Sequence, residues 1–448
     1  MIPNDIFYRN YVSTGIANFL SKKFKHVKIL ICDDLDYQAN LNFQKYTFDQ
    51  RHEKFHYQYL KILSWRNRNL SRTFKYRFLR TSQFHAVAIS DLKSWRTLKL
   101  ILWKNWTSFL RRAKILFLAN SVIFPITNLV FKFILKPDAS LEAFVKKFSP
   151  DAVLMPSSAY DPAVIDMISI CQHYNIKSVL LVDNWDNLSS KSVLWCRPDL
   201  VAVWGEQTKE HAMQIQGFKK EQISCIGTPR FEQYFNKRNK VLVSHFDFKY
   251  VLFVGQVLPS DELRIVIIIN DILCSSQFKD TGIKLVYRPH PWAQDQNKAS
   301  VEQLKAVIVD PQIDAKGPSL ERVEKFQPNL DYYPSLLQNA EFVVSSLTSM
   351  IIEASIFRKN VIAIAHREAN NYTSPHRLLK EYRHFEGIEV LPNLIISHTE
   401  KDLIKEFKSL METSKHINEL SLDMKLKRFL NSEGTYHERL LAMLDENI

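Results

Sequence analysis

Glycine is scarce in this 448-residue chain, with only nine residues, and the shortage excludes several common sites. Neither the G-x-x-x-x-G-K pattern of a phosphate loop nor the G-x-G-x-x-G dinucleotide fingerprint occurs. The five cysteines are scattered and form no C-x-x-C pair: Cys32, Cys171, Cys196, Cys225 and Cys274. We therefore expect no disulfide framework and no zinc knuckle, and this cysteine usage favours a reducing compartment.

We also expect no secretory signal, because the first twenty residues are polar and contain no small-residue cleavage site. Apolar residues make up 46% of the chain, which predicts a globular protein rather than a disordered one. The length suffices for two domains of ordinary size.

Basic charge is present and concentrated in one segment. The whole chain carries a net charge of +13, and residues 61–114 contain fourteen Lys or Arg against one acid, Asp91, with Trp and Phe interleaved. Anionic lipid attracts each basic residue near its surface by ~1 kcal/mol, and Trp prefers the membrane interface. The segment therefore predicts an anionic membrane surface as partner; a solvated helical face and RNA binding are the alternatives.

The apolar segment 115–135 is long enough to span a bilayer. Four residues interrupt it: Asn120, Pro125, Asn128 and Lys132. Because polar groups at mid-span are costly, we expect an interfacial or buried helix pair. Residues 61–135 are thus predicted to dock a peripheral protein on the cytoplasmic face of the inner (plasma) membrane.

Strand-like apolar runs alternate with helical segments along the rest of the chain. The expected strands are 27–32, 84–90, 152–156, 178–183, 200–205, 223–227, 250–255, 283–288, 305–310, 341–346 and 361–366. The expected helices include 8–23, 161–174, 260–276, 350–358 and an amphipathic tail, 401–448. Such alternation predicts parallel β-α-β units and the α/β class. We expect two Rossmann-like domains facing across a cleft, residues 1–240 for the acceptor and 241–425 for the donor, with a C-terminal helix (426–448) packing back on the first domain.

Polar residues follow five of these strands, where ligands of open α/β sheets bind. They are Asp183 and Asp186, Arg230, Gly255 and Gln256, Arg288 and His290, and the group Ser345, Ser346, Thr348, Ser349 and Glu353. Hydroxyls and free N–H groups at the start of a helix suit a phosphate, and Glu353 one turn later suits two ribose hydroxyls. An ordinary helix cap with a surface Glu is the alternative.

Two prolines restrain the neighbouring Arg288 and His290 to extended backbone. Their guanidinium fork and imidazole would then face a phosphate or carboxylate. On the opposite wall, Asp183 or Asp186 could act as general base, or as nucleophile if the reaction retains configuration. A solvent-exposed strand end and an Asx-rich turn are the respective alternatives.

Several motifs together resemble those of the GT-B surface-polysaccharide glycosyltransferases, over about residues 150–390. They are WDNLSSK (185–191), VWGE (203–206), GTPRF (227–231), RPHP (288–291), SSLTSMIIEAS (345–355) and RHF (383–385). That group includes CDP-glycerol glycerophosphotransferases, capsule Kdo and sialic-acid transferases and, more distantly, UDP-N-acetylglucosamine 2-epimerases.

The resemblance implies a nucleotide-activated donor held by the second domain. His290 would lie by the donor phosphate or sugar acid, the hydroxyls of 345–349 would hold phosphate, Glu353 the ribose, and His384 would belong to the donor site. Asp33, Asp34 and Asp36 have D-x-D spacing, but they follow the first strand in the acceptor half. We therefore expect transfer without a metal or other cofactor.

The cationic character of the expected cleft suits an acidic sugar, such as Kdo or a nonulosonate, carried by CMP. The expected acceptor is a lipid-linked glycan or polysaccharide in capsule, O-antigen or lipopolysaccharide biosynthesis. A CDP-glycerol-type glycerophosphotransferase, a UDP-N-acetylglucosamine 2-epimerase-like enzyme and a basic nucleic-acid-binding protein are the alternatives; nucleic acid is not the expected partner.

Overall fold

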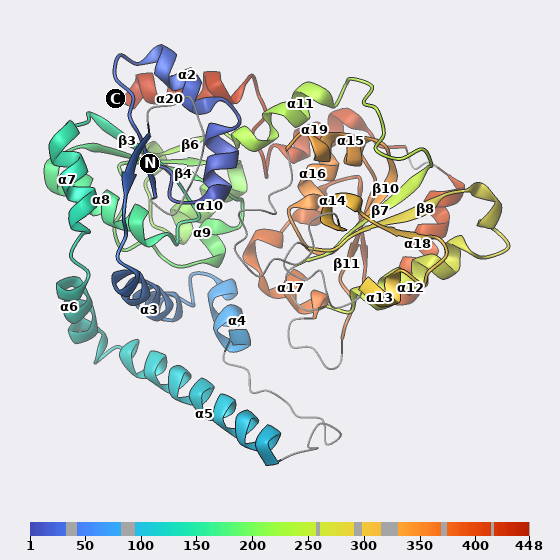
Figure 1. Cartoon of the computed structure of the whole chain (residues 1–448), viewed down its shortest axis with the longest axis horizontal. Coiled ribbons are helices and arrows are strands. Elements are labelled where there is room, and N and C mark those ends of the chain that lie inside the picture. The colour runs from blue at the N-terminus through green and yellow to red at the C-terminus, as the bar shows by residue number, and fades with distance from the viewer. Residues whose placement is uncertain are drawn as a thin grey trace.

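The protein forms two α/β lobes that lie side by side (Figure 1). The structure is a computed structural model and describes residues 1–32, 43–81, 95–256, 260–290, 298–314, 330–368, 374–413 and 416–447. Each lobe is built around a parallel sheet. The expected α/β class with two Rossmann-like domains is therefore confirmed.

The first lobe holds a four-stranded parallel sheet in the order β3-β4-β5-β6 and a separate parallel pair, β1-β2. Its strands are β1 (Ile29–Cys32), β2 (Phe43–Tyr46), β3 (Ala152–Ser157), β4 (Lys177–Val182), β5 (Leu200–Val203) and β6 (Ile223–Cys225). Its helices are α1 (Asp5–Phe7), α2 (Ile16–Lys23), α3 (Gln50–Arg66), α4 (Arg72–Thr81), α5 (Trp95–Leu118), α6 (Phe124–Ile134), α7 (Ala139–Phe148), α8 (Pro162–Tyr174), α9 (Asn187–Ser190), α10 (Glu206–Gln214) and α11 (Glu232–Lys237).

The second lobe holds a six-stranded parallel sheet in the order β12-β11-β10-β7-β8-β9. Its strands are β7 (Tyr250–Val254), β8 (Lys284–Arg288), β9 (Val307–Val309), β10 (Ala340–Ser345), β11 (Val361–Ile364) and β12 (Leu394–Ser397). Its helices are α12 (Glu262–Leu273), α13 (Lys298–Val301), α14 (Pro311–Asp314), α15 (Tyr332–Gln338), α16 (Met350–Ile356), α17 (Pro375–Glu381), α18 (Glu400–Glu412) and α19 (Glu419–Leu426). Every residue of β7 is buried, as expected for a strand covered by helices on both faces.

The strand order of the second sheet reverses between β7 and β10. The chain runs from β7 to β8 and β9 on one side, and then from β10 to β11 and β12 on the other. Connections that diverge in this way leave a crevice at the carboxyl ends of the two central strands, which is where open α/β sheets bind ligands. The topology therefore singles out Gly255–Gln256 and Ser345–Ser346, which follow β7 and end β10.

Some elements differ from the expected pattern. The expected helix 8–23 is divided into a π-helical turn, Tyr8–Val12, and α2, with Gly15 in the left-handed region between them. Strands β2 and β12 were not expected. The expected strand 84–90 and the Asp33–Asp36 turn lie outside the described residues.

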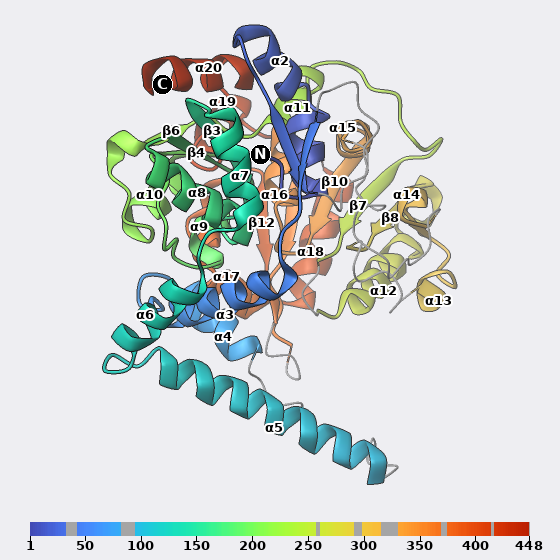
Figure 2. The same cartoon turned by 60° about the vertical axis from the view of Figure 1, so that its left-hand side comes forward.

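The described residues of the predicted membrane-docking segment, 61–81 and 95–135, lie in the end of α3, in α4 to α6 and in the turns between them. Helix α5 projects away from both lobes, whereas α4 contacts α9 of the first lobe and α17 of the second (Figures 1 and 2). Residues 115–135 form a helix pair as expected, because α5 ends at Leu118 and α6 begins at Phe124. None of the described helices combines the length and the apolar character that a membrane-spanning helix needs.

The last helix, α20 (Tyr436–Asn447), returns to the first lobe, where it lies beside α2 (Figure 1). Its buried face, including Leu440 and Leu444, packs with Ile16 of α2 and Leu181 of β4 in one apolar cluster. The chain therefore ends against the domain in which it began.

Candidate functional site

The carboxyl ends of β7, β8 and β10 lie next to one another. The Gly255 N–H donates to the Arg288 carbonyl at 2.9 Å, and the Ser346 N–H donates to the Val254 carbonyl at 2.9 Å. Three of the polar strand ends singled out by the sequence are thereby joined by backbone hydrogen bonds. They form the second-lobe wall of the candidate site.

Gly255 is required by a close approach of Glu262. A Cβ atom at position 255 would lie 2.3 Å from Glu262 Oε2, which is far inside van der Waals contact. The Glu262 carboxylate accepts hydrogen bonds from the Tyr287 hydroxyl and the Gln256 N–H, each at 2.7 Å, and burial raises its pKa. The Gln256 side chain is also buried, and its amide has no hydrogen-bond partner among the described residues.

Arg288 is buried and engaged within the second lobe. Its guanidinium forms an ion pair with Asp310 and donates to Gln312 and the Tyr333 hydroxyl, at 2.9 and 3.1 Å. Burial opposes its charge, but Tyr333 and Asp310 outweigh that and raise the pKa of Arg288 above its usual range. A ligand would therefore meet Arg288 as part of a neutralised group rather than as a free cation.

His290 follows two residues after the end of β8 and is partly buried. Burial first, and then the charge of Arg288, lower the pKa of His290 to about 4. At neutral pH the ring is therefore uncharged, so it can donate one hydrogen bond or accept a proton, but it brings no positive charge to the site.

The hydroxyl-rich turn makes hydrogen bonds of its own. Ser345 Oγ donates to the Ser346 carbonyl at 2.6 Å, and Thr348 Oγ1 accepts from the Met350 N–H at 3.3 Å. Ser349 Oγ donates to Glu353 Oε1 at 3.2 Å, so this side chain faces α16. The turn is thus held in one conformation by its own polar groups, with Ser346 at its edge lining a cavity.

Glu353 joins the two lobes. Its Oε1 lies 3.4 Å from a terminal nitrogen of Arg230, and its Oε2 accepts from the Tyr234 hydroxyl at 3.1 Å. Arg230 comes from the turn after β6 in the first lobe and stacks over the Phe231 ring at 4.4 Å. The carboxylate predicted to face a ribose therefore faces an arginine from the opposite domain.

Replacing Arg230 with Met should lower the free energy of unfolding by about 3 kcal/mol, because it leaves the buried Glu353 carboxylate without its cation. Chemical denaturation of the two proteins measures this difference. Adding Glu353→Gln to Arg230→Met should recover part of the loss, since the uncompensated charge is then removed.

Arg264→Met provides the matched control. Arg264 also pairs with a glutamate, Glu400, at 2.7 and 2.8 Å, but both side chains are about half exposed. Exposed pairs contribute about 0–1 kcal/mol. Equal losses for Arg230→Met and Arg264→Met would contradict the assignment of Arg230 as a buried interdomain contact.

The sequence analysis did not choose between Asp183 and Asp186 as the general base. Their surroundings shift their pKa values in opposite directions. Asp183 is buried at the end of β4; it accepts from Asn10 Nδ2 at 2.8 Å, and burial raises its pKa. Burial also opposes the charge of Asp186, but Lys191 and a hydrogen bond from Ser190 at 2.7 Å help to lower its pKa. Of the two carboxylates, Asp183 with its raised pKa is the stronger base.

His384 lies at the contact between the lobes but packs mainly among aromatic rings. Its ring meets Trp185 edge-on at 5.2 Å and lies 4.4 Å from Phe385. Burial lowers the pKa of His384 to about 4, although Asp186 nearby favours its charged form. This places His384 beside Asp186.

The N-terminal segment supplies residues that the sequence analysis did not single out. Asn10 bonds Asp183, and the Arg9 guanidinium exerts its charge on Asp183, Arg230 and Tyr333. Arg9 and Asn10 lie in the π-helical turn Tyr8–Val12. No local motif marks them, because their partners are far along the chain.

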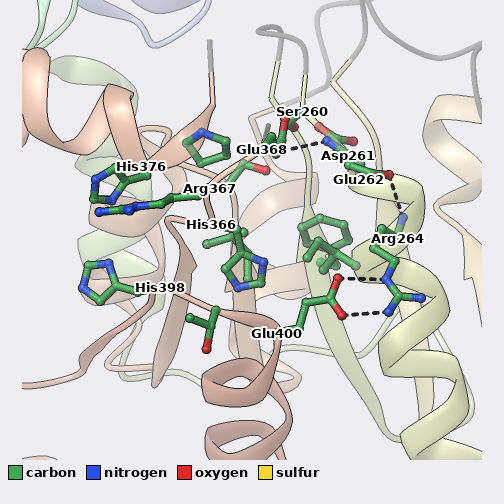
Figure 3. A pocket seen from close by; sticks show the side chains of 16 residues that line it. Ser260, Asp261, Glu262, Arg264, His366, Arg367, Glu368, His376, His398 and Glu400 are labelled. Carbon is green, nitrogen blue, oxygen red and sulfur yellow. Dashed lines mark hydrogen bonds and ion pairs between the residues drawn. The ribbon is translucent and has the colours of Figure 1, made fainter. Parts of the chain in front are cut away.

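A cavity of about 1010 Å³ opens at the ends of β7, β10, β11 and β12. Figure 3 shows His366, Arg367, His376 and His398 on one side of it and the Arg264–Glu400 pair on the other. Burial lowers the pKa values of His366 and His376, so Arg367 is the main cation on that side. The sequence contains a pattern that could have predicted this side of the cavity. The run VIAIAH (361–366) is a further apolar strand that ends in a polar residue, His366.

No protein-family model matches the chain, and no curated protein does. Solved structures with a similar backbone include a putative UDP-N-acetylglucosamine 2-epimerase from Listeria monocytogenes (16% identity, 68% of this chain and 77% of that chain, TM-score 0.46). Another is the UDP-GlcNAc 2-epimerase from Neisseria meningitidis bound to UDP-GlcNAc (12% identity, 69% and 80%, TM-score 0.45). The wall teichoic acid polymerase TagF is similar over 61% of this chain and 68% of its own, at 13% identity and a TM-score of 0.39. These are likenesses of backbone shape, and 16% of residues or fewer are identical in each of the three.

Proposed function

We propose that this protein is a glycosyltransferase that moves a sugar from a nucleotide-activated donor to an acceptor hydroxyl where its two lobes meet. The observation that carries the proposal is the reversal of strand order between β7 and β10. Ligands of open α/β sheets bind at such a point, and here it is flanked by the Ser345–Ser349 turn and by Gly255–Gln256. The turn reaches Glu353, which contacts the first lobe through Arg230.

In this proposal the second lobe holds the donor. The phosphate lies against the hydroxyls of Ser346, Thr348 and Ser349 and the N–H groups of Thr348 and Ser349, with His290 as a neutral hydrogen-bond donor. Glu353 exchanges its contact with Arg230 for the ribose hydroxyls, and the released guanidinium then faces the phosphate. Both groups are charged and buried, so the exchange keeps each of them partnered.

Asp183 is the general base in the proposed reaction. The acceptor hydroxyl gives its proton to an Asp183 oxygen while its own oxygen forms a bond to the donor carbon. The bond from that carbon to the donor phosphate breaks, and the nucleotide leaves with the electron pair. Arg230 and Arg9, whose charges already act on Asp183, stabilise the departing phosphate without a metal ion.

An acidic sugar carried by CMP fits this setting best. Arg9 and Arg230 lie near Asp183, and Arg367 lines the adjoining cavity, so the donor meets several guanidinium groups. Guanidinium recognises a carboxylate with two parallel hydrogen bonds, which a neutral hexose cannot form. CDP-glycerol, with its phosphodiester, is the second candidate on the same reasoning.

We further propose that helices α5 and α6 dock the enzyme on the cytoplasmic face of an anionic membrane, beside a lipid-linked acceptor. The exposed apolar residues of these helices and of the turn between them include Leu102, Trp103, Trp106, Phe109, Leu110, Phe117, Val122, Ile126, Leu129, Val130 and Phe133. Basic residues of the same helices, such as Lys104 and Arg111, are complementary to anionic headgroups. Trp and Phe beside Lys and Arg on a projecting helix are typical of an interfacial helix.

A panel of CMP-, CDP- and UDP-linked donors, each titrated in a thermal-shift assay of the full chain, tests the proposal. One donor should raise the melting temperature, and His290→Ala should weaken its binding by about tenfold, with the exposed residue His245 replaced by Ala as control. A panel in which no donor stabilises the protein would contradict it. Conversion of UDP-N-acetylglucosamine without acceptor would identify an epimerase, and salt-sensitive RNA binding without donor binding would identify a nucleic-acid-binding protein.

A further inference from the structure

The sequence HEKFH, residues 52–56, lies in the first two turns of α3. Residues four apart on a helix share one face, so His52 and His56 point in the same direction. Asp166 of the neighbouring helix α8 meets them there. Two histidines at this spacing with one carboxylate are a frequent ligand set for zinc.

The ligand atoms of the three residues lie within 4.8 Å of one another, close enough to share one ion. His52 Nε2 lies 2.9 Å from Asp166 Oδ2, His56 Nε2 lies 2.8 Å from Asp166 Oδ1, and the two Nε2 atoms are 3.2 Å apart. Ligands at about 2.0–2.1 Å from a tetrahedral Zn²⁺ are separated by roughly 3.3 Å. The three contacts are therefore only slightly shorter than the edges of a zinc tetrahedron.

Hydrogen bonds alone satisfy this arrangement poorly. The Nε2 atoms of His52 and His56 face each other and also the Asp166 carboxylate. If one Nε2 carries a proton, it can donate to the carboxylate or to the other nitrogen, but the unprotonated nitrogen then faces a carboxylate oxygen without a proton between them. Asp166 Oδ1 has no hydrogen-bond partner among the described residues, although His56 Nε2 is 2.8 Å away. A cation between the three groups would serve all of these contacts at once.

The site is enclosed but not sealed. The side chains of His56 and Asp166 are 0% and 1% exposed, whereas that of His52 is 15% exposed and gives an ion a route from solvent. The second oxygen of Asp166 also accepts from the Asp138 N–H at 3.0 Å, a contact that would orient the carboxylate as a ligand.

We propose that His52, His56 and Asp166 bind one Zn²⁺ ion that fastens α3 to α8. Helix α3 leads into α4, which contacts both lobes, so the ion would fix the base of the insertion that carries α5. The Glu53 carboxylate accepts a hydrogen bond from the Tyr57 hydroxyl, which favours a structural ion over the hydrolytic centre that an H-E-x-x-H helix can form.

Titration calorimetry of the chelator-treated full chain with ZnCl₂ tests this site. The expected result is one equivalent of Zn²⁺ bound and a higher melting temperature at saturation. Asp166→Asn keeps the shape of the side chain but removes the anionic ligand. It should weaken binding at least about a hundredfold, because loss even of an outer contact to a metal ligand costs about 10–100-fold.

His52→Ala is the second variant, chosen because His52 is partly exposed and its loss leaves the apolar core intact. His26→Ala, at an exposed histidine of the same lobe, is the control and should bind Zn²⁺ as the parent does. Failure of the parent to bind Zn²⁺ would overturn the proposal. So would binding that Asp166→Asn and His52→Ala leave unchanged, since that would assign the ion to surface histidines.

Discussion

Replacing Asp183 with Asn should lower the rate of sugar transfer by about a thousandfold, within the range that loss of a general base costs. The carboxamide has nearly the same size and can still bond Asn10, but it cannot take a proton from the acceptor hydroxyl. Initial rates at saturating donor and acceptor measure the loss. Donor affinity in the thermal-shift assay should change little, because the donor is proposed to lie on the second lobe.

Asp186→Asn is the control for this experiment. Asp186 stands three residues away in the same turn, yet its lowered pKa makes it a weak base, so the expected loss is less than tenfold. A larger loss for Asp186→Asn than for Asp183→Asn would assign the base to Asp186. Equal loss of activity and of stability in Asp183→Asn would give Asp183 a structural role instead.

The pH profile carries the same information without a mutation. Burial raises the pKa of Asp183, and a base must be deprotonated to act, so activity should fall as the pH drops through that raised pKa. The acidic limb of kcat should therefore lie above the pKa of an ordinary aspartate. An acidic limb at or below the ordinary value would exclude Asp183 as the base.

Replacing Trp103, Trp106 and Phe109 with Glu should reduce binding to anionic vesicles by at least about a hundredfold. The exposed fractions of these side chains are 65%, 56% and 47%, so little packing is lost within the protein. Each aromatic residue withdrawn from the interface forfeits apolar burial of about 1.5 kcal/mol or more, and each added carboxylate repels the anionic surface. Sedimentation with phosphatidylserine-containing vesicles measures the effect.

The matched control is Leu420→Glu with Met424→Glu, at two side chains of α19 that are 80% and 66% exposed. These substitutions also add acid at exposed apolar positions, but on the second lobe and away from the projecting helix. Vesicle binding should survive them. Continued sedimentation of the α5 variant, or equal loss in the control, would refute docking through α5 and α6.

Local patterns predicted most of the scaffold that positions the site. The polar ends of β7, β8 and β10 could be found because a buried strand reads as a continuous apolar run, and the residue that ends the run is visible in the sequence. Strand β2, Phe43–Tyr46, was missed because FQKY mixes polar with aromatic residues and is only partly buried.

The ion-pair partners of the candidate side chains were less predictable. Proline on both sides of His290 suggested that Arg288 would present a free fork, but Asp310 neutralises the guanidinium inside the second lobe. Glu353, which was expected to face a ligand, meets Arg230 in this structure. In each case the partner lies on a separate element, and no pattern within a few residues reports which charges will meet.

The α/β class follows from local patterns along the chain, because runs such as YVLFV (250–254) are apolar on both faces and need helices on each side. Which polar groups meet depends on the folded arrangement: Asn10 contacts Asp183, Arg230 contacts Glu353, and His52 and His56 contact Asp166. Burial of apolar surface follows local periodicity, whereas the pairing of charges depends on distances between segments that are more than a hundred residues apart.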